Sequence, residues 1–71
     1  MEKKIRPEDV VSFVHESLND LERIYDYAST AGEEMLEKGN LSYAIVLKEI
    51  ASTIKPLVER KEELLSKVMG F

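Results

Sequence analysis

The chain has 71 residues, of which 44% are hydrophobic and 34% charged, and its formal net charge is −4. This length allows a single domain over residues 1–71, and the composition is that of a folded chain rather than a disordered one. Cysteine is absent, which excludes a disulfide framework and a thiolate metal site. The negative charge and the scattered basic residues also argue against nucleic acid as the main partner.

Membrane and secretion signals are missing from the sequence. No apolar run approaches the roughly 20 residues that a membrane span needs. Residues 1–6 carry charges but no apolar segment follows them, so they do not form a secretory signal. We therefore expect a cytoplasmic protein with no membrane partner. The lack of Gln and Cys beside plentiful Glu and Lys is typical of thermophilic proteins.

The first predicted element is a long helix over residues 7–38, preceded by a disordered tail over residues 1–6. Pro7 suits the first turn of a helix, because its missing N–H would have no partner there. Glu8 and Asp9 complement the positive end of the helix dipole.

Apolar residues recur along this helix in alternating steps of three and four. They form one stripe made of Val11, Val14, Leu18, Leu21, Tyr25, Ala28, Gly32 and Met35. Thr30 and Glu33 have the spacing of a capping box, which could begin a new helix. The phase of the stripe does not slip there, so we predict one continuous helix. Gly32 lies on the stripe, which predicts close approach of a second helix.

The predicted turn is Gly39-Asn40, because both residue types tolerate the left-handed backbone conformation. A second helix over residues 41–69 follows. Its main stripe consists of Tyr43, Leu47, Ile50, Ile54, Leu57, Leu64 and Val68, and beside it lie Ala44, Ala51, Val58 and Leu65. Pro56 should kink this helix, and the alternative is a break into two helices.

The fold predicted from these elements is an all-α antiparallel hairpin of two long helices, the second kinked at Pro56. Folding about the turn places Gly32 against Leu47 and leaves one charge, Lys61, on the second stripe. The stripes are wider than one partner helix can cover, so we expect two copies to form a four-helix bundle as a homodimer. The alternative is a monomeric three-helix bundle in which residues 57–69 fold back. The predicted interaction face consists of Val10, Ile24, Ala31, Ala44, Ala51, Val58 and Leu65.

Small residues and the turn are spaced as in a known helical repeat. The matching positions are Gly32, Gly39-Asn40, Ala44-Ile45, Ala51 and Pro56. Residues 25–56 thereby resemble a single tetratricopeptide repeat, and they are also similar to microtubule-interacting-and-transport domains. The resemblance implies protein–protein interaction. The sequence departs from the repeat at Ala28, Ala31 and Lys48, and the tetratricopeptide family binds through several stacked repeats where this chain has one.

An acidic pattern offers an alternative function. Glu33-Glu34-x-x-Glu37 with Glu59-x-x-Glu62 resembles the signature of all-helical, magnesium-dependent nucleoside triphosphate pyrophosphohydrolases. The first three carboxylates fall away from the apolar stripe, which indicates a solvated face. We expect no metal or acid–base role for His15, the sole histidine. The favoured prediction is a small acidic interaction module that is not an enzyme, has no cofactor, and binds a protein partner or a second copy.

Overall fold

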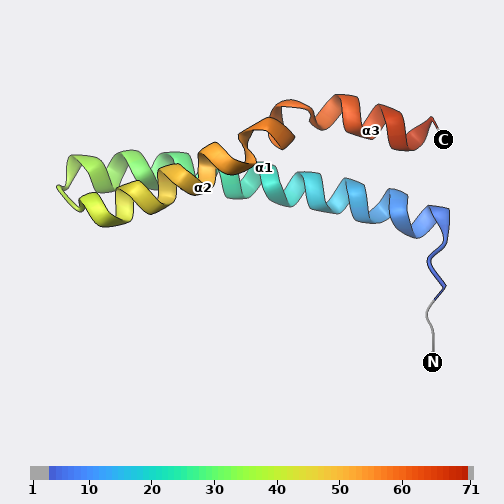
Figure 1. Cartoon of the computed structure of the whole chain (residues 1–71), viewed down its shortest axis with the longest axis horizontal. Helices are drawn as coiled ribbons and strands as arrows, with labels where there is room; N and C mark the ends of the chain where they lie inside the picture. Colours follow the sequence, from blue (N-terminus) through green and yellow to red (C-terminus); the bar gives the residue numbers. More distant parts are fainter. Residues whose placement is uncertain (1–3, 71) are drawn as a thin grey trace.

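The computed structural model describes residues 4–70 and contains three helices (Figure 1). Helix α1 spans Pro7–Glu37, α2 spans Leu41–Glu59 and α3 spans Lys61–Met69. No strand occurs between residues 4 and 70, so the all-α prediction is confirmed. Helices α1 and α2 run antiparallel, and α3 continues beside the first half of α1.

Helix α1 begins where the sequence predicts it. Pro7 is its first residue, and the Arg6 backbone N–H donates a hydrogen bond of 3.3 Å to the Asp9 carboxylate. The helix continues without a break past Thr30, which confirms one helix rather than two. Of the predicted disordered tail, residues 1–3 lie outside the described residues, and residues 4–6 are not helical.

The turn after α1 depends on the left-handed backbone of Gly39, whose φ is +79°. The Asn40 N–H donates to the Met35 carbonyl at 2.8 Å, and the Gly39 N–H donates to the Leu36 carbonyl at 3.1 Å. These two bonds are the Schellman pattern, which satisfies carbonyls that the helix end would otherwise leave unpaired. The prediction of a turn at Gly39-Asn40 is confirmed.

Gly39→Ala should therefore lower the free energy of unfolding by about 1 kcal/mol, since a Cβ is strained in the left-handed region. The space around Gly39 is open, so the cost would come from the backbone alone. Gly39→Asn is the matched variant and should lose less, because Asn tolerates this conformation. Urea denaturation of both variants checks this; equal midpoints for Gly39→Ala and wild type would contradict it.

The seam between α1 and α2 is built from small residues. Ala28 and Gly32 on α1 are buried, as are Ala44 and Ala51 on α2. A Cβ added to Gly32 would lie 3.2 Å from the Lys48 Cγ and 3.6 Å from the Leu47 Cβ. The predicted contact between Gly32 and Leu47 is thus confirmed, and the absence of a side chain lets the helices approach closely.

The orientation of α2 differs from the prediction. Tyr43, Ile50 and Leu57 were expected in the seam, but they are 68%, 41% and 43% exposed. Ala44 and Ala51 were expected to be partly exposed as members of the interaction face, but they are only 2% and 8% exposed. The close approach at Gly32 favours this orientation, because the small side chains of Ala44 and Ala51 let the backbones of α1 and α2 come near each other.

The second arm is two helices rather than the single kinked helix predicted for residues 41–69. Helix α2 passes through Pro56 and ends at Glu59, and Arg60 leaves the helical conformation with φ −97° and ψ 11°. The Pro56 carbonyl still accepts a bond of 3.2 Å from the Arg60 N–H. Pro56 lacks the backbone N–H that would donate a helical hydrogen bond, and its ring clashes with the preceding turn. Both effects weaken the backbone hydrogen bonding of α2 shortly before the break. The break was the alternative stated for this region.

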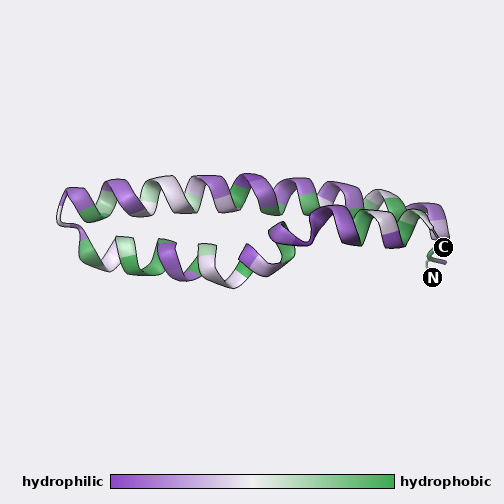
Figure 2. Ribbon diagram, turned by 90° about the horizontal axis from the view of Figure 1, so that it is seen from above, coloured by the Kyte–Doolittle hydropathy of each residue, from purple (hydrophilic) through white to green (hydrophobic). Residues whose placement is uncertain are grey.

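The helices form an elongated body rather than a rounded one (Figure 2). Its principal extents are 48 × 32 × 14 Å and its radius of gyration is 16.0 Å, where a compact domain of this length has about 11 Å. The three-helix arrangement fits the alternative fold in the number of helices. Helix α3 nevertheless contacts α1 and α2 far less than these two contact each other. Much of each helix therefore faces outward.

Pro56→Ala should preserve or raise the free energy of unfolding, by at most about 3 kcal/mol, because it restores a helical hydrogen bond in α2. Pro56 is exposed, so its ring contributes little packing that could be lost. Circular dichroism during thermal unfolding measures the change. A large loss of stability would show instead that the proline ring is needed where it lies.

Candidate interaction surface

A stripe of mostly exposed residues runs along each arm, and each of its members directly precedes a seam residue in the sequence. On α1 it consists of Val10, Phe13, Ser17, Asp20, Ile24, Tyr27 and Ala31. Along α2 and α3 it consists of Tyr43, Val46, Ile50, Thr53, Leu57, Arg60, Leu64 and Lys67. Both sets alternate steps of three and four, with Asp20 the one acidic member. We call these the α1 stripe and the α2–α3 stripe.

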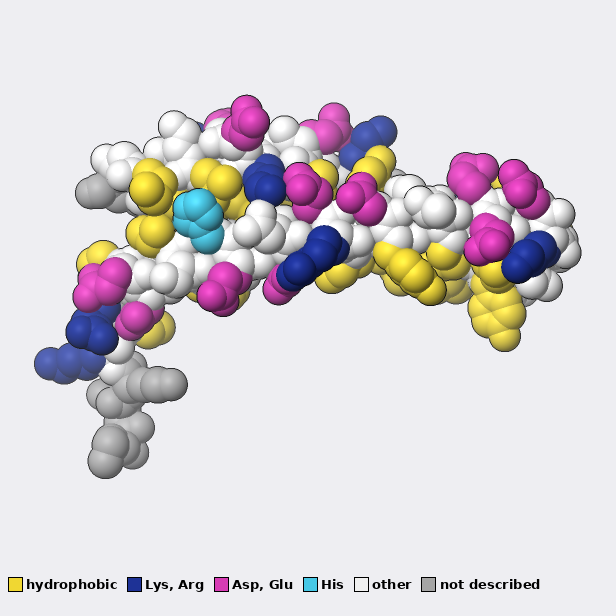
Figure 3. Space-filling model, turned by 180° about the vertical axis from the view of Figure 1, so that it is seen from behind, with side chains coloured by type: hydrophobic (Ala, Val, Ile, Leu, Met, Phe, Trp, Pro, Cys, Tyr) yellow, Lys and Arg dark blue, Asp and Glu magenta, His cyan; other side chains and the backbone are white. Residues whose placement is uncertain are grey.

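At each level of the molecule the two stripes lie on the same side of the helix pair. In both arms a stripe residue comes directly before a seam residue in the sequence. Because both helices are right-handed and the arms run antiparallel, the residue before a seam residue points to the same side in each arm. A shallow groove of about 430 Å³ between α1 and α3 supports this placement, because Phe13 and Ser17 line it together with Leu64 and Lys67. Towards the turn, Figure 3 shows hydrophobic side chains gathered along one edge of the α1–α2 pair.

Large apolar side chains on this surface are open to solvent. Tyr27 is 72% exposed and Phe13 is 63% exposed. Val46 and Ile50 also line a shallow groove along α2. Soluble monomers rarely leave large apolar areas uncovered, so a surface that carries these side chains is suited to a binding partner.

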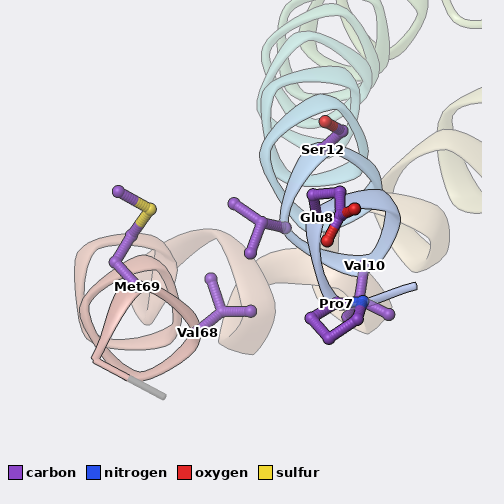
Figure 4. A pocket seen from close by; sticks show the side chains of 7 residues that line it. Pro7, Glu8, Val10, Ser12, Val68 and Met69 are labelled. Carbon is purple, nitrogen blue, oxygen red and sulfur yellow. The ribbon is translucent and has the colours of Figure 1, made fainter.

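The free ends of α1 and α3 diverge and leave a second apolar groove (Figure 4). Pro7 and Val10 line it from the first turn of α1, and Val68 and Met69 line it from the end of α3. Its volume is about 710 Å³, and it is open to solvent along its length. The helix ends are thus poorly packed against each other, and α3 is the least supported element.

An ion-pair chain crosses the exposed side of α3. Glu63 lies 3.0 Å from Arg60 Nε and 3.2 Å from Lys67 Nζ. Hydrogen bonds from Arg60 and then Lys67, with their positive charges, lower the pKa of the Glu63 carboxyl to about 2. The same hydrogen bond raises the pKa of Arg60. The pairs are exposed, so they orient the side chains more than they stabilise the fold.

This pKa shift predicts how α3 responds to acid. The folded pKa of Glu63, about 2, is below the ordinary value of 4.5, so the interaction is fully present above pH 4.5 and is lost as the pH falls toward 2. Helix α3 should fray first over this range. An NMR titration that follows the Glu63 carboxyl carbon and the α3 amides checks this; an ordinary Glu63 titration midpoint would contradict it.

One ion pair is partly buried and joins the arms. Lys61 Nζ lies 3.4 Å from both carboxylate oxygens of Glu22, and the Lys61 side chain is 23% exposed. On the seam Lys61 is thus neutralised across the α1–α3 contact. A second cross-link joins Lys48 to Glu33 at 2.9 Å. These two pairs show which residues of α1 lie at the same height along the long axis as which residues of the second arm.

The structure does not bring the acidic candidate residues together. Glu33 pairs with Lys48, whereas Glu59 and Glu62 line a groove beside Glu22. Glu22 and Glu33 are eleven residues apart on α1, which is about 16 Å along a helix.

Histidine, aspartate and glutamate side chains hold a metal ion only where several of them lie close together. In residues 4–70 no group of three His, Asp or Glu side chains is placed to hold a metal ion. His15 is exposed.

The predicted interaction face is divided by the structure. Val10, Ile24 and Ala31 belong to the α1 stripe, whereas Ala44 and Ala51 are buried in the seam. Val58 and Leu65 are half-buried seam residues. Sequence reasoning missed the most exposed apolar members of the surface, which are Tyr27, Tyr43, Phe13 and Val46. Their signal was present, since each occupies the position before a seam residue.

Comparison of the chain with protein-family models, curated proteins and solved structures finds no match. In the described part of the chain, every helix is too short or too polar to cross a membrane.

Proposed function

We propose that this chain is a cytoplasmic protein–protein interaction module that works through the α1 and α2–α3 stripes. The observation that carries the proposal is the amount of surface left open. The accessible surface is 5872 Å², whereas a folded monomer of 8.1 kDa has about 4,500 Å². The accessible surface therefore exceeds the expected value by roughly 1,400 Å², and the chain exposes apolar side chains along both stripes.

The contact we propose is self-association into a four-helix bundle. If two chains each cover an excess of this size, the buried total falls within the roughly 2,000–5,000 Å² typical of obligate homodimers. Twofold pairing of flat helical layers is the common way to bury such surfaces. The area available therefore suits a stable dimer.

The spacing of the stripes supports a helical partner. Steps of three and four keep side chains along a line that a second helix can follow, with each side chain inserting between residues of that helix. The resemblance of residues 25–56 to a tetratricopeptide repeat supports the same class of function. No observation favours the hydrolase alternative, because its carboxylates lie at two separate levels of the α1–α2 pair.

The dependence of unfolding on protein concentration tests this proposal. A dimer that unfolds to two separate chains is stabilised by mass action, so its urea midpoint rises with concentration. We expect such a rise between about 1 and 100 μM, a range over which mass action shifts the equilibrium measurably. A cooperative transition whose midpoint is independent of concentration would contradict self-association.

A further inference from the structure

We propose that the two copies pair about a twofold axis parallel to the long axis of the molecule, with both turns at the same end. The α1 stripe of each copy then lies on the α2–α3 stripe of the other, and Asp20 faces Arg60 of the second copy. This inference rests on the self-association proposed above. It names the surface, the register and the charge pair that select the partner.

Contacts within one chain fix the register. Gly32 lies against Leu47, Glu33 pairs with Lys48, and Glu22 pairs with Lys61. Level residues in the two arms therefore have numbers that add to about 81. A twofold axis along the molecule leaves every residue at its own level, so the same rule describes which residues of two copies face each other.

This register matches large side chains with small ones. It brings together Ala31 with Ile50, Tyr27 with Thr53, Ile24 with Leu57, and Ser17 with Leu64. Three of these four pairs set a small side chain against a large one, as close packing between helices requires. Leu64 and Ser17 already border the groove between α3 and α1, so the second copy would fill that groove.

The charges on the stripes are complementary in the same register. Asp20 is the one acidic side chain on the α1 stripe, and the α2–α3 stripe holds only cations, Arg60 and Lys67. Asp20 falls level with Arg60 of the second copy. Lys67 falls level with Phe13, whose ring can cover its aliphatic stem and attract its ammonium group. Within one chain Asp20 and Arg60 have only exposed neighbours, Arg23 and Glu63.

The other twofold arrangement, with turns at opposite ends, lacks this match. An axis perpendicular to the helices sets α1 on α1 and α2 on α3. Because Glu22 is near the middle of α1 and level with Lys61, Arg60 would then lie against Arg60. Like charges at the centre oppose this arrangement.

A distance between spin labels at the turn separates the two arrangements. The chain contains no cysteine, so Ser42→Cys can carry a single label at an exposed site near the turn. We expect labels less than about 30 Å apart, since paired helices pack 8–10 Å from one another. If the protein is a dimer but the labels are near 48 Å apart, the length of the molecule, the proposed arrangement is wrong and self-association stands. Monomeric protein in the same sample would overturn the proposed self-association as well.

Reversing the charges tests the Asp20–Arg60 pair. Asp20→Arg and Arg60→Asp should each raise the dimer dissociation constant about tenfold or more, because like charges then meet twice. The double variant should recover affinity close to wild type. Sedimentation velocity gives the dissociation constants, and circular dichroism shows whether each variant keeps its helices. Folded single variants with unchanged affinity, or a double variant no better than the singles, would overturn the pairing.

Discussion

Ile50→Glu should convert the proposed dimer into monomers. Ile50 is near the middle of the α2 part of the stripe and is 41% exposed in one chain, so the substitution disturbs little within that chain. In the assembly it would bury a carboxylate among apolar side chains, twice because of the symmetry. An interface hot-spot residue contributes about 2 kcal/mol, which is about 30-fold in affinity, and the symmetry counts Ile50 twice, so we expect the dissociation constant to rise at least about 100-fold.

Ile45→Glu is the matched control for this variant. Ile45 belongs to the same helix and is 64% exposed, but it lies on the other flank of α2 and outside the stripe. Its affinity should stay within about threefold of wild type, as expected for a residue outside the contact. Size-exclusion chromatography with light scattering compares the two variants. Equal dissociation by both, or by neither, would contradict the assignment of the surface.

Gly32→Val should cause the largest loss of stability within the chain. The Cβ alone would reach 3.2 Å from Lys48 Cγ, and the two methyl groups of Val extend further toward α2. Forcing extra carbon into a packed seam costs about 1–3 kcal/mol. A fall of that size in the free energy of unfolding, measured with urea, is the expected result; an unchanged value would mean that the helices are further apart than described.

Gly32→Ala separates the effect of added side-chain volume in the seam from the effect of helix propensity. Alanine favours a helix over glycine by about 1 kcal/mol. Its Cβ meets the flexible Lys48 side chain rather than backbone at the closest point, so this chain can move aside. We expect Gly32→Ala to be nearly neutral. A loss as large as that of Gly32→Val would show that any carbon at this position is excluded.

The turn and the seam side of α1 could be predicted from the sequence because each rests on local rules. Gly39 permits a left-handed backbone wherever it occurs, and the spacing of Leu18 and Ala28 gives the seam side of α1 directly. The seam side of α2 could not be predicted this way. Its apolar residues occupy two adjacent stripes, and periodicity does not say which stripe faces α1.

The choice on α2 is made by distance between the helices. Gly32 brings the backbones close, which favours Ala44 and Ala51 over Tyr43 in the seam. The sequence also favoured a kink over the break at Arg60, because the apolar phase continues across it from Val58 to Leu65. The orientation of α2 turns Tyr43, Ile50 and Leu57 outward, and it therefore defines the α2 part of the candidate surface.

Sedimentation equilibrium of the wild-type chain at micromolar concentration tests the central claim most directly. The claim is that the exposed stripes are covered by a second copy. We predict a single species of about 16 kDa, twice the chain mass of 8.1 kDa, dissociating only on dilution. A cooperatively folded species that remains at 8.1 kDa over the whole concentration range would contradict the account.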